Sequence, residues 1–188
     1  SRGYTELNAA RDFLAANEPL SDPFTLLDMD KAARRVRRAI DRREQICVFG
    51  DYDVDGITAT CLLTDFLRRQ GARAVSYIPA RLEEGYGLNE MALRSLREQN
   101  VQLIVTVDCG ITANDEAALC RALGMELVIT DHHECKSELP EAVAVVDPHR
   151  LDQPQPASEL AGVGVAFKLA CAIGGDTASL LREYCDFL

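Results

Sequence analysis

Short apolar runs alternate with longer amphipathic stretches along most of the chain. Five runs rich in Val, Ile and Leu are predicted to be strands, at residues 45–50, 73–79, 101–108, 125–131 and 142–147. Apolar residues at helical spacing predict helices at residues 57–70, 88–100, 113–123 and 158–173. The strands show almost no polar alternation, which is typical of a parallel sheet buried on both faces. The pattern therefore predicts a doubly wound, mainly parallel five-stranded α/β sheet with helices on both faces.

Two further helices are predicted before the first strand, at residues 5–16 and 28–43, with a turn at 20–24 between them. The second is amphipathic, and its polar side carries a row of basic residues: Lys31, Arg34, Arg35, Arg38 and Arg42. A basic face of this kind is more often solvated than functional, and contact with DNA or RNA is the alternative. We expect residues 1–44 to be a helical lead-in to an α/β domain at residues 45–188.

Composition narrows the class of protein. With 188 residues, 47% of them hydrophobic, the chain is expected to form a packed core. Its net charge of −10 and pI of about 4.8, taken alone, disfavour nucleic acid as a partner. Seven cysteines without C-x-x-C spacing indicate a reducing, cytoplasmic location. The sequence shows neither a signal-peptide pattern nor a membrane-spanning apolar run, so no membrane partner is expected.

Acids and histidines follow four of the five predicted strands. They are Asp51, Asp53, Asp55, Asp108, Asp131, His132, His133, Asp147 and His149. Parallel strands place such residues together at the carboxyl edge of the sheet, where α/β proteins bind ligands. Clustered carboxylates are costly unless protons or metal ions neutralise them. Carboxylates with imidazoles suit Mn²⁺ or Mg²⁺, and this set is large enough for the two-metal arrangement of phosphoryl hydrolysis.

Structural interpretations compete with this one at single positions. Asp51 or Asp55 alone reads as a helix N-cap, but capping does not account for acids at four strand ends. In an alternating segment, Asp55 would face the same side as Asp53. His149 is expected in solvent. The glycines of "AGVGVAF" (161–167) lack a full phosphate-loop pattern, so we interpret them as sites of close helix packing.

Four motifs, in this order, resemble those of the DHH phosphoesterase superfamily. They are "DYDVDG" (51–56), "VTVDCG" (105–110), "TDHH" (130–133) and "DPH" (147–149). Flanking segments such as "PARLEEGYGLN" and "ELAGVGVAFKLA" are similar to those of its RecJ branch, the single-strand-specific 5′→3′ exonucleases of DNA repair and recombination. The resemblance covers nearly the whole chain. It implies metal-dependent hydrolysis of phosphodiester bonds, with single-stranded DNA as the substrate.

The resemblance also assigns roles to residues. It implies a Mn²⁺ or Mg²⁺ site whose ligands are Asp53, Asp55, Asp108 and His132. Asp108 would bridge two ions, and His133 would contact the scissile phosphate.

Four other residues receive supporting roles from the same resemblance. Asp51 and Asp131 would orient ligands or hold their charge state. Arg81 would clamp a phosphate, and Tyr86 would stack on a base. An ordinary loop-packing role is the alternative for Arg81 and Tyr86.

The chain departs from the family pattern in two ways. Some DHH members carry a histidine where this chain has Phe49, which cannot bind metal. The family also supplies a further ligand Asp from a segment expected just past Leu188. We therefore expect an incomplete catalytic domain and metal site, without the DHHA1 and oligonucleotide-binding domains, and a fragment that is inactive alone.

Several functions stay open beside the exonuclease. One is a DHH phosphodiesterase acting on short oligonucleotides or cyclic dinucleotides. Another is a non-catalytic DHH scaffold in replication, which the intact ligand set disfavours. A response-regulator or haloacid-dehalogenase site is disfavoured, because both require a lysine near the end of a later strand. Other replication or repair proteins are conceivable partners.

Overall fold

The computed structural model describes residues 6–8, 11, 20–80, 87–136, 138–153, 160–174 and 176–188. Arg81 and Tyr86, with their expected substrate contacts, lie outside the described residues. So does most of the helix expected at residues 5–16.

The centre of the fold is a five-stranded sheet in the order β2-β1-β3-β4-β5, with parallel pairing throughout. The strands are β1 (Gln45–Gly50), β2 (Arg73–Tyr77), β3 (Leu103–Val107), β4 (Glu126–Thr130) and β5 (Ala144–Val146). This confirms the predicted five-stranded sheet. The strand order reverses between β1 and β3, and such a switch point opens a crevice at the carboxyl ends of its two strands.

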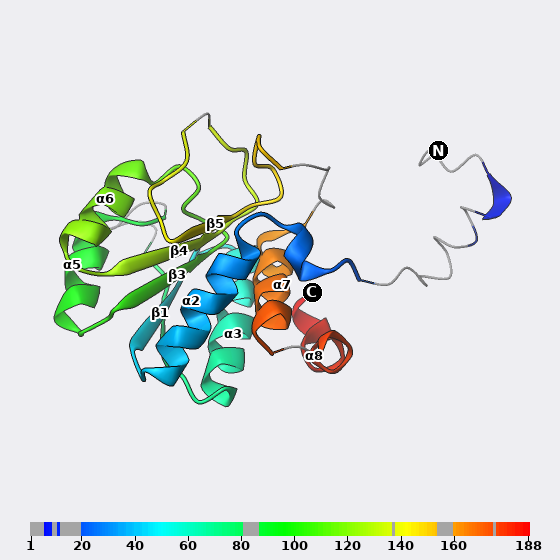
Figure 1. Ribbon diagram of the computed structural model, residues 1–188, viewed down its shortest axis with the longest axis horizontal. Helices are drawn as coiled ribbons and strands as arrows, with labels where there is room; N and C mark the ends of the chain where they lie inside the picture. Colours follow the sequence, from blue (N-terminus) through cyan, green and yellow to red (C-terminus); the bar gives the residue numbers. More distant parts are fainter. Residues whose placement is uncertain are drawn as a thin grey trace.

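Helices cover both faces of the sheet, as predicted (Figure 1). One face packs against α2 (Met29–Asp41), α3 (Val54–Arg69) and α7 (Gly162–Gly174). The other face packs against α5 (Glu90–Glu98) and α6 (Asn114–Ala122). A short 3-10 helix, η1 (Pro23–Thr25), stands where a turn was expected. Two C-terminal elements were not predicted, α8 (Thr177–Tyr184) and η2 (Cys185–Phe187).

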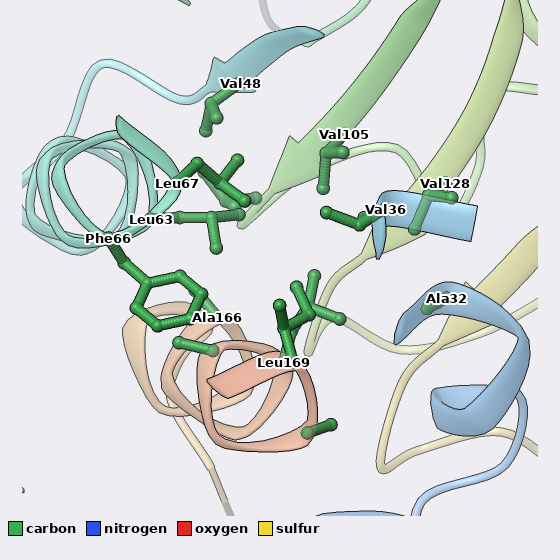
Figure 2. Close-up of a cluster of buried hydrophobic side chains, with 14 of the residues drawn as sticks. Ala32, Val36, Val48, Leu63, Phe66, Leu67, Val105, Val128, Ala166 and Leu169 are labelled. Carbon is green, nitrogen blue, oxygen red and sulfur yellow. The ribbon is translucent and has the colours of Figure 1, made fainter. Parts of the chain in front are cut away.

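The larger core lies between the sheet and the α2, α3 and α7 helices. Figure 2 shows Val48 of β1 and Val105 of β3 beside Leu63 of α3, with Val36 of α2 and Leu169 of α7 completing the cluster. All five side chains are fully buried. Burial of each contributes about 1.5–3 kcal/mol, which fixes the strand ends that carry the acids.

Two local predictions need correction. The helix expected at residues 57–70 begins at Val54, so Asp55 lies in its first turn, while Asp53 before it keeps an extended backbone. Arg35 does not belong to a solvated face. It is 3% exposed, and its guanidinium bonds the carboxylates of Glu44 and Glu126. Among the described residues, no helix combines the length and apolar character needed to cross a membrane.

Candidate metal centre

Carboxylates and imidazoles from three strand ends meet at the carboxyl edge of the sheet. Ligand atoms of Asp51, Asp53 and Asp108 lie within 4.8 Å of one another. The ligand atoms of Asp108, His132 and His133 also lie within 4.8 Å of one another and form a second group. Asp108 belongs to both groups, so the geometry allows its carboxylate to serve two cations.

The first acids lie at the junction of β1 and α3. Asp53 is the N-cap of α3, and its Oδ1 accepts a hydrogen bond of 2.9 Å from the N–H of Gly56. The capping residue is therefore Asp53, neither Asp51 nor Asp55. A Cβ at Gly56 would lie 2.6 Å from the carbonyl oxygen of Asp51, so the tight turn requires glycine there.

Asp55 lies in the first turn of α3 and faces the start of α7. Its two carboxylate oxygens accept hydrogen bonds from the N–H groups of Gly162 and Val163, each 2.7 Å long. Asp55 is thereby held at the positive end of the α7 dipole. Its Oδ2 lies 3.6 Å from Nε2 of His132, whose distance to Oδ1 of Asp108 is 3.1 Å. Asp55 therefore borders the ligand groups without belonging to either.

Gly162 was interpreted as a site of close helix packing, and its closest neighbour is a carboxylate. An added Cβ would lie 2.6 Å from Cβ of Asp108 and closer still to its Oδ1. At Gly164 the same atom would meet only Leu160, at an ordinary 3.4 Å. Gly162 is therefore a site residue, although the pattern "AGVGVAF" indicates only a closely packed helix there.

Burial dominates the electrostatics of Asp108. The residue is 1% exposed and has a left-handed backbone, with φ of 60°. Burial first, and then the charges of Asp55 and Asp53, raise the pKa of Asp108 to about 8. Without a cation, this carboxyl group keeps its proton at neutral pH, so a cation that binds there has to displace that proton.

Asp131 organises the loop after β4. Its Oδ2 accepts a hydrogen bond of 2.9 Å from the N–H of Ile111, and its Oδ1 accepts one of 2.7 Å from the N–H of His132. Nδ1 of His133 lies 2.7 Å from the same Oδ1. Burial raises the pKa of Asp131, but the hydrogen bonds together hold it below its usual value.

His133 is held in its charged form by the Asp131 carboxylate. The hydrogen bond to Asp131 raises the pKa of His133 to about 9, so its imidazole is cationic at neutral pH. A cationic ring suits contact with an anion, whereas metals bind neutral imidazole. The charge of His133 suits the phosphate contact expected for it.

A hydrogen bond from His149 also supports the backbone of His132, and the sequence did not predict it. The N–H of His149 donates to Oδ1 of the buried Asp147 at 2.6 Å, and Nδ1 of His149 lies 2.6 Å from the carbonyl oxygen of His132. A carbonyl only accepts, so Nδ1 carries the proton. The His149 side chain is 43% exposed, as expected, yet it also braces the His132 backbone. The motif "DPH" placed these residues at the correct edge but gave no sign of this contact.

A hollow of about 640 Å³ opens beside the ligand groups. Its lining consists of Asp51, Tyr52, Asp53, Gly110, Ile111, Thr112, Asp131 and His133. Phe49 does not reach it: the side chain is fully buried and stacks on Tyr77 with ring centroids 5.2 Å apart. The lining carries the acids and the cationic His133, so the hollow can take a cation together with a phosphate group.

Comparisons with known proteins agree with this arrangement. The chain is 46% identical to the single-stranded-DNA-specific exonuclease RecJ of Bacillus subtilis, over 97% of this chain and 23% of that protein. A crystal structure of exonuclease RecJ bound to manganese superposes with a TM-score of 0.80 and 35% identity, over 90% of this chain and 43% of the other. The crystal structure of RecJ from Thermus thermophilus in complex with Mn²⁺ superposes with a TM-score of 0.77 and 30% identity. This match covers 91% of this chain and 24% of the other.

The chain spans about a quarter of the length of the curated RecJ proteins that it matches. The family model described as "DHH family, N-terminal domain" matches residues 45–188. These residues contain the whole sheet and all the groups of the candidate metal centre. The chain therefore belongs to the DHH family.

Proposed function

We propose that this chain carries the metal-binding part of a Mn²⁺- or Mg²⁺-dependent exonuclease that degrades single-stranded DNA from the 5′ end. The observation that carries the proposal is the position of Asp108, which is shared by two ligand groups at the switch point of the sheet. The names of the similar proteins, single-stranded-DNA-specific exonucleases, and the manganese in the similar RecJ structures support it.

The donor set fits such cations. Asp53, Asp55, Asp108 and His132 supply carboxylate oxygens and one imidazole, without thiolate ligands, which suits Mn²⁺ and Mg²⁺. The pKa of Asp108, raised to about 8 by burial and by the charges of Asp55 and Asp53, indicates that a proton neutralises this carboxylate when no cation is bound. Bound cations of this kind supply polarisation of the phosphodiester and stabilisation of charge on its oxygens.

The protein's own groups would hold the substrate phosphate. We propose that His133, kept cationic by Asp131, contacts the scissile phosphate, and that Asp51 and Asp131 orient the neighbouring ligands. Arg81 is proposed as a phosphate clamp and Tyr86 as a base-stacking group. From the RecJ resemblance, we further propose a cytoplasmic role in DNA repair and recombination alongside other proteins of those pathways.

Hydrolysis of 5′-labelled single-stranded DNA with Mn²⁺, by this chain extended past Leu188 to the length of its RecJ relatives, tests the proposal. Asp108→Asn keeps the shape of the neutral carboxyl group but cannot bind a cation as a carboxylate, so hydrolysis and calorimetric Mn²⁺ binding should both be lost. Asp115→Asn, on the exposed first turn of α6, is the matched control and should retain both. Unchanged hydrolysis by Asp108→Asn would show that the site is wrongly assigned. Faster hydrolysis of dinucleotides or cyclic dinucleotides than of long strands would favour the short-substrate alternative.

A further inference from the structure

The exposed side of α2 is strongly positive in an acidic chain. Residues 29–43 contain seven basic and two acidic residues, a net charge of +5, while the thirteen basic and twenty-eight acidic residues elsewhere give −15. Arg35 is buried against carboxylates, and the exposed Arg37 donates to carbonyl groups at the end of α7. Four of the others form what we call the α2 basic face: Lys31, Arg34, Arg38 and Arg42.

The α2 basic face lines a groove. Its residues recur every three or four positions and so lie in a row along the helix, about 6 Å apart for the arginines. A groove of about 650 Å³ runs beside them, with Asp41 and Val143 also in its lining. The row is therefore both accessible and regularly spaced.

The present partners of these side chains are weakly held. Lys31, Arg34 and Arg38 pair with acids at 2.6, 2.7 and 3.1 Å, and their side chains are 55%, 65% and 46% exposed. Pairs this exposed contribute about 0–1 kcal/mol each. Within the described residues, Arg42 forms no ion pair. A polyanion can therefore replace the existing partners at little cost.

We propose that the α2 basic face binds the phosphate backbone of single-stranded nucleic acid, an inference that rests on the proposed function. Guanidinium groups suit bidentate contact with phosphate, and a regular row of them matches a polymer with one negative charge per repeat. An acidic peptide has no such obligatory repeat. The groove lining, in the described part of the chain, contains no aromatic residue. Recognition is therefore of phosphates and not of bases.

The α2 basic face begins at the same edge of the sheet as the metal centre. Asp28, the partner of Lys31, also accepts a hydrogen bond of 2.9 Å from Nη1 of Arg150, which follows His149 in sequence. Near its other end, α2 contacts Glu126, the first residue of β4, which lies at the amino-terminal ends of the strands. Thirteen helical residues span about 20 Å. A strand on this face would thus contact nucleotides remote from those in the site, so only long substrates would use it.

Two triple variants test the inference. Arg34→Gln/Arg38→Gln/Arg42→Gln removes three charges from the α2 basic face. The matched control removes three exposed charges from the α5 and α6 side of the sheet: Arg94→Gln/Arg97→Gln/Arg121→Gln. Both are made in the extended protein used for the hydrolysis test. The probes are 5′-phosphorylated oligothymidylates of four and thirty residues, and circular dichroism confirms that both variants are folded.

Only the α2 variant should lose affinity for the thirty-mer, about tenfold or more at 0.1 M salt. Its slope of log affinity against log salt should fall by about 2, since each phosphate contact on a single strand contributes about 0.7. Hydrolysis of the four-mer with Mn²⁺ should stay at the wild-type rate.

Several results would overturn the inference. One is wild-type affinity and salt slope in the α2 variant, and another is an equal loss in the control. Tighter wild-type binding of a glutamate decapeptide than of the thirty-mer, lost in the α2 variant, would identify an acidic protein partner instead. Four-mer hydrolysis by the wild type separates the two proposals, because its absence counts against the proposed function and not against the α2 basic face.

Discussion

Gly162→Ala tests the geometry of the metal centre most directly. The N–H of Gly162 holds one oxygen of Asp55, and the Cα faces the side chain of Asp108. The added methyl would lie 2.6 Å from Cβ of Asp108, where carbon atoms normally need about 3.5 Å. Either Asp108 or the start of α7 therefore has to move by roughly 1 Å, and movement of α7 also moves Asp55.

The structure sets the expected magnitude. Overpacking of this kind costs about 1–3 kcal/mol of stability. Disturbing the groups that orient metal ligands lowers metal affinity about 10–100-fold. The two carboxylates concerned come from different strand ends, so Gly162→Ala should weaken Mn²⁺ binding by a factor within that range even where the protein remains fully folded.

Gly164→Ala is the matched control for this experiment. It lies two residues further along α7, and its new methyl would make only an ordinary contact with Leu160 at 3.4 Å. Both substitutions replace glycine by alanine in the first turn of α7, so the two variants differ mainly in what the new methyl group meets. Titration calorimetry with Mn²⁺ measures affinity, and urea unfolding in EDTA measures the stability of the metal-free protein. Equal Mn²⁺ affinity in the two variants would refute the account of Gly162.

Three further substitutions probe charge and support. In EDTA, the stability advantage of Asp108→Asn over wild type should grow from pH 4 to pH 8, because the folded wild type keeps a proton on Asp108 that the unfolded chain loses. Thermal unfolding at several pH values measures this advantage. A difference in stability that does not change with pH would contradict the prediction. His149→Ala should cost about 1 kcal/mol in urea unfolding and weaken calorimetric Mn²⁺ binding through the His132 backbone. Arg35→Met should cost about 3 kcal/mol in urea unfolding, against less than about 1 for Arg34→Met.

The linkage at His133 has the same sign as that at Asp108. A folded pKa of about 9 means that the cationic form stabilises the fold fully below the ordinary value of 6.5, and this contribution is lost as pH rises through 9. Asp131 behaves oppositely, since its lowered pKa gives stability that is lost only in acid. The metal-free protein is therefore expected to lose stability in acid through Asp131. It should lose stability again as pH rises, from about 4 to 8 through Asp108 and from 6.5 to 9 through His133.

The sheet and the position of its acids were predictable because both follow from local pattern. Continuous apolar runs identify the strands, and parallel pairing then brings Asp108 and His132 to one edge without any knowledge of side-chain contacts. The first residue of α3 was harder to predict, because "DYDVDG" has no apolar periodicity. The Asp53 cap and the turn at Gly56 set that boundary.

Long-range contacts were beyond the sequence. The bond between Asp55 and Gly162 joins residues 107 positions apart, and helical periodicity does not say which strand end a helix start will meet. The burial of Arg35 escaped for the same reason. A helical wheel places it with the polar residues, but its guanidinium reaches Glu126 on β4, and only the assembled fold shows that the two meet.

Asp53, Asp55 and Asp108 lie close together after two neighbouring strands, and the fold accommodates each of these carboxyl groups differently. Asp53 is satisfied by the start of its own helix, and Asp55 by the start of another. Asp108 is buried near both, and burial together with their charges raises its pKa to about 8, so it holds a proton. The metal-free site is thus stable because one charge is absent. If cations bind there as proposed, they exchange with that proton, so metal affinity should rise with pH up to about 8.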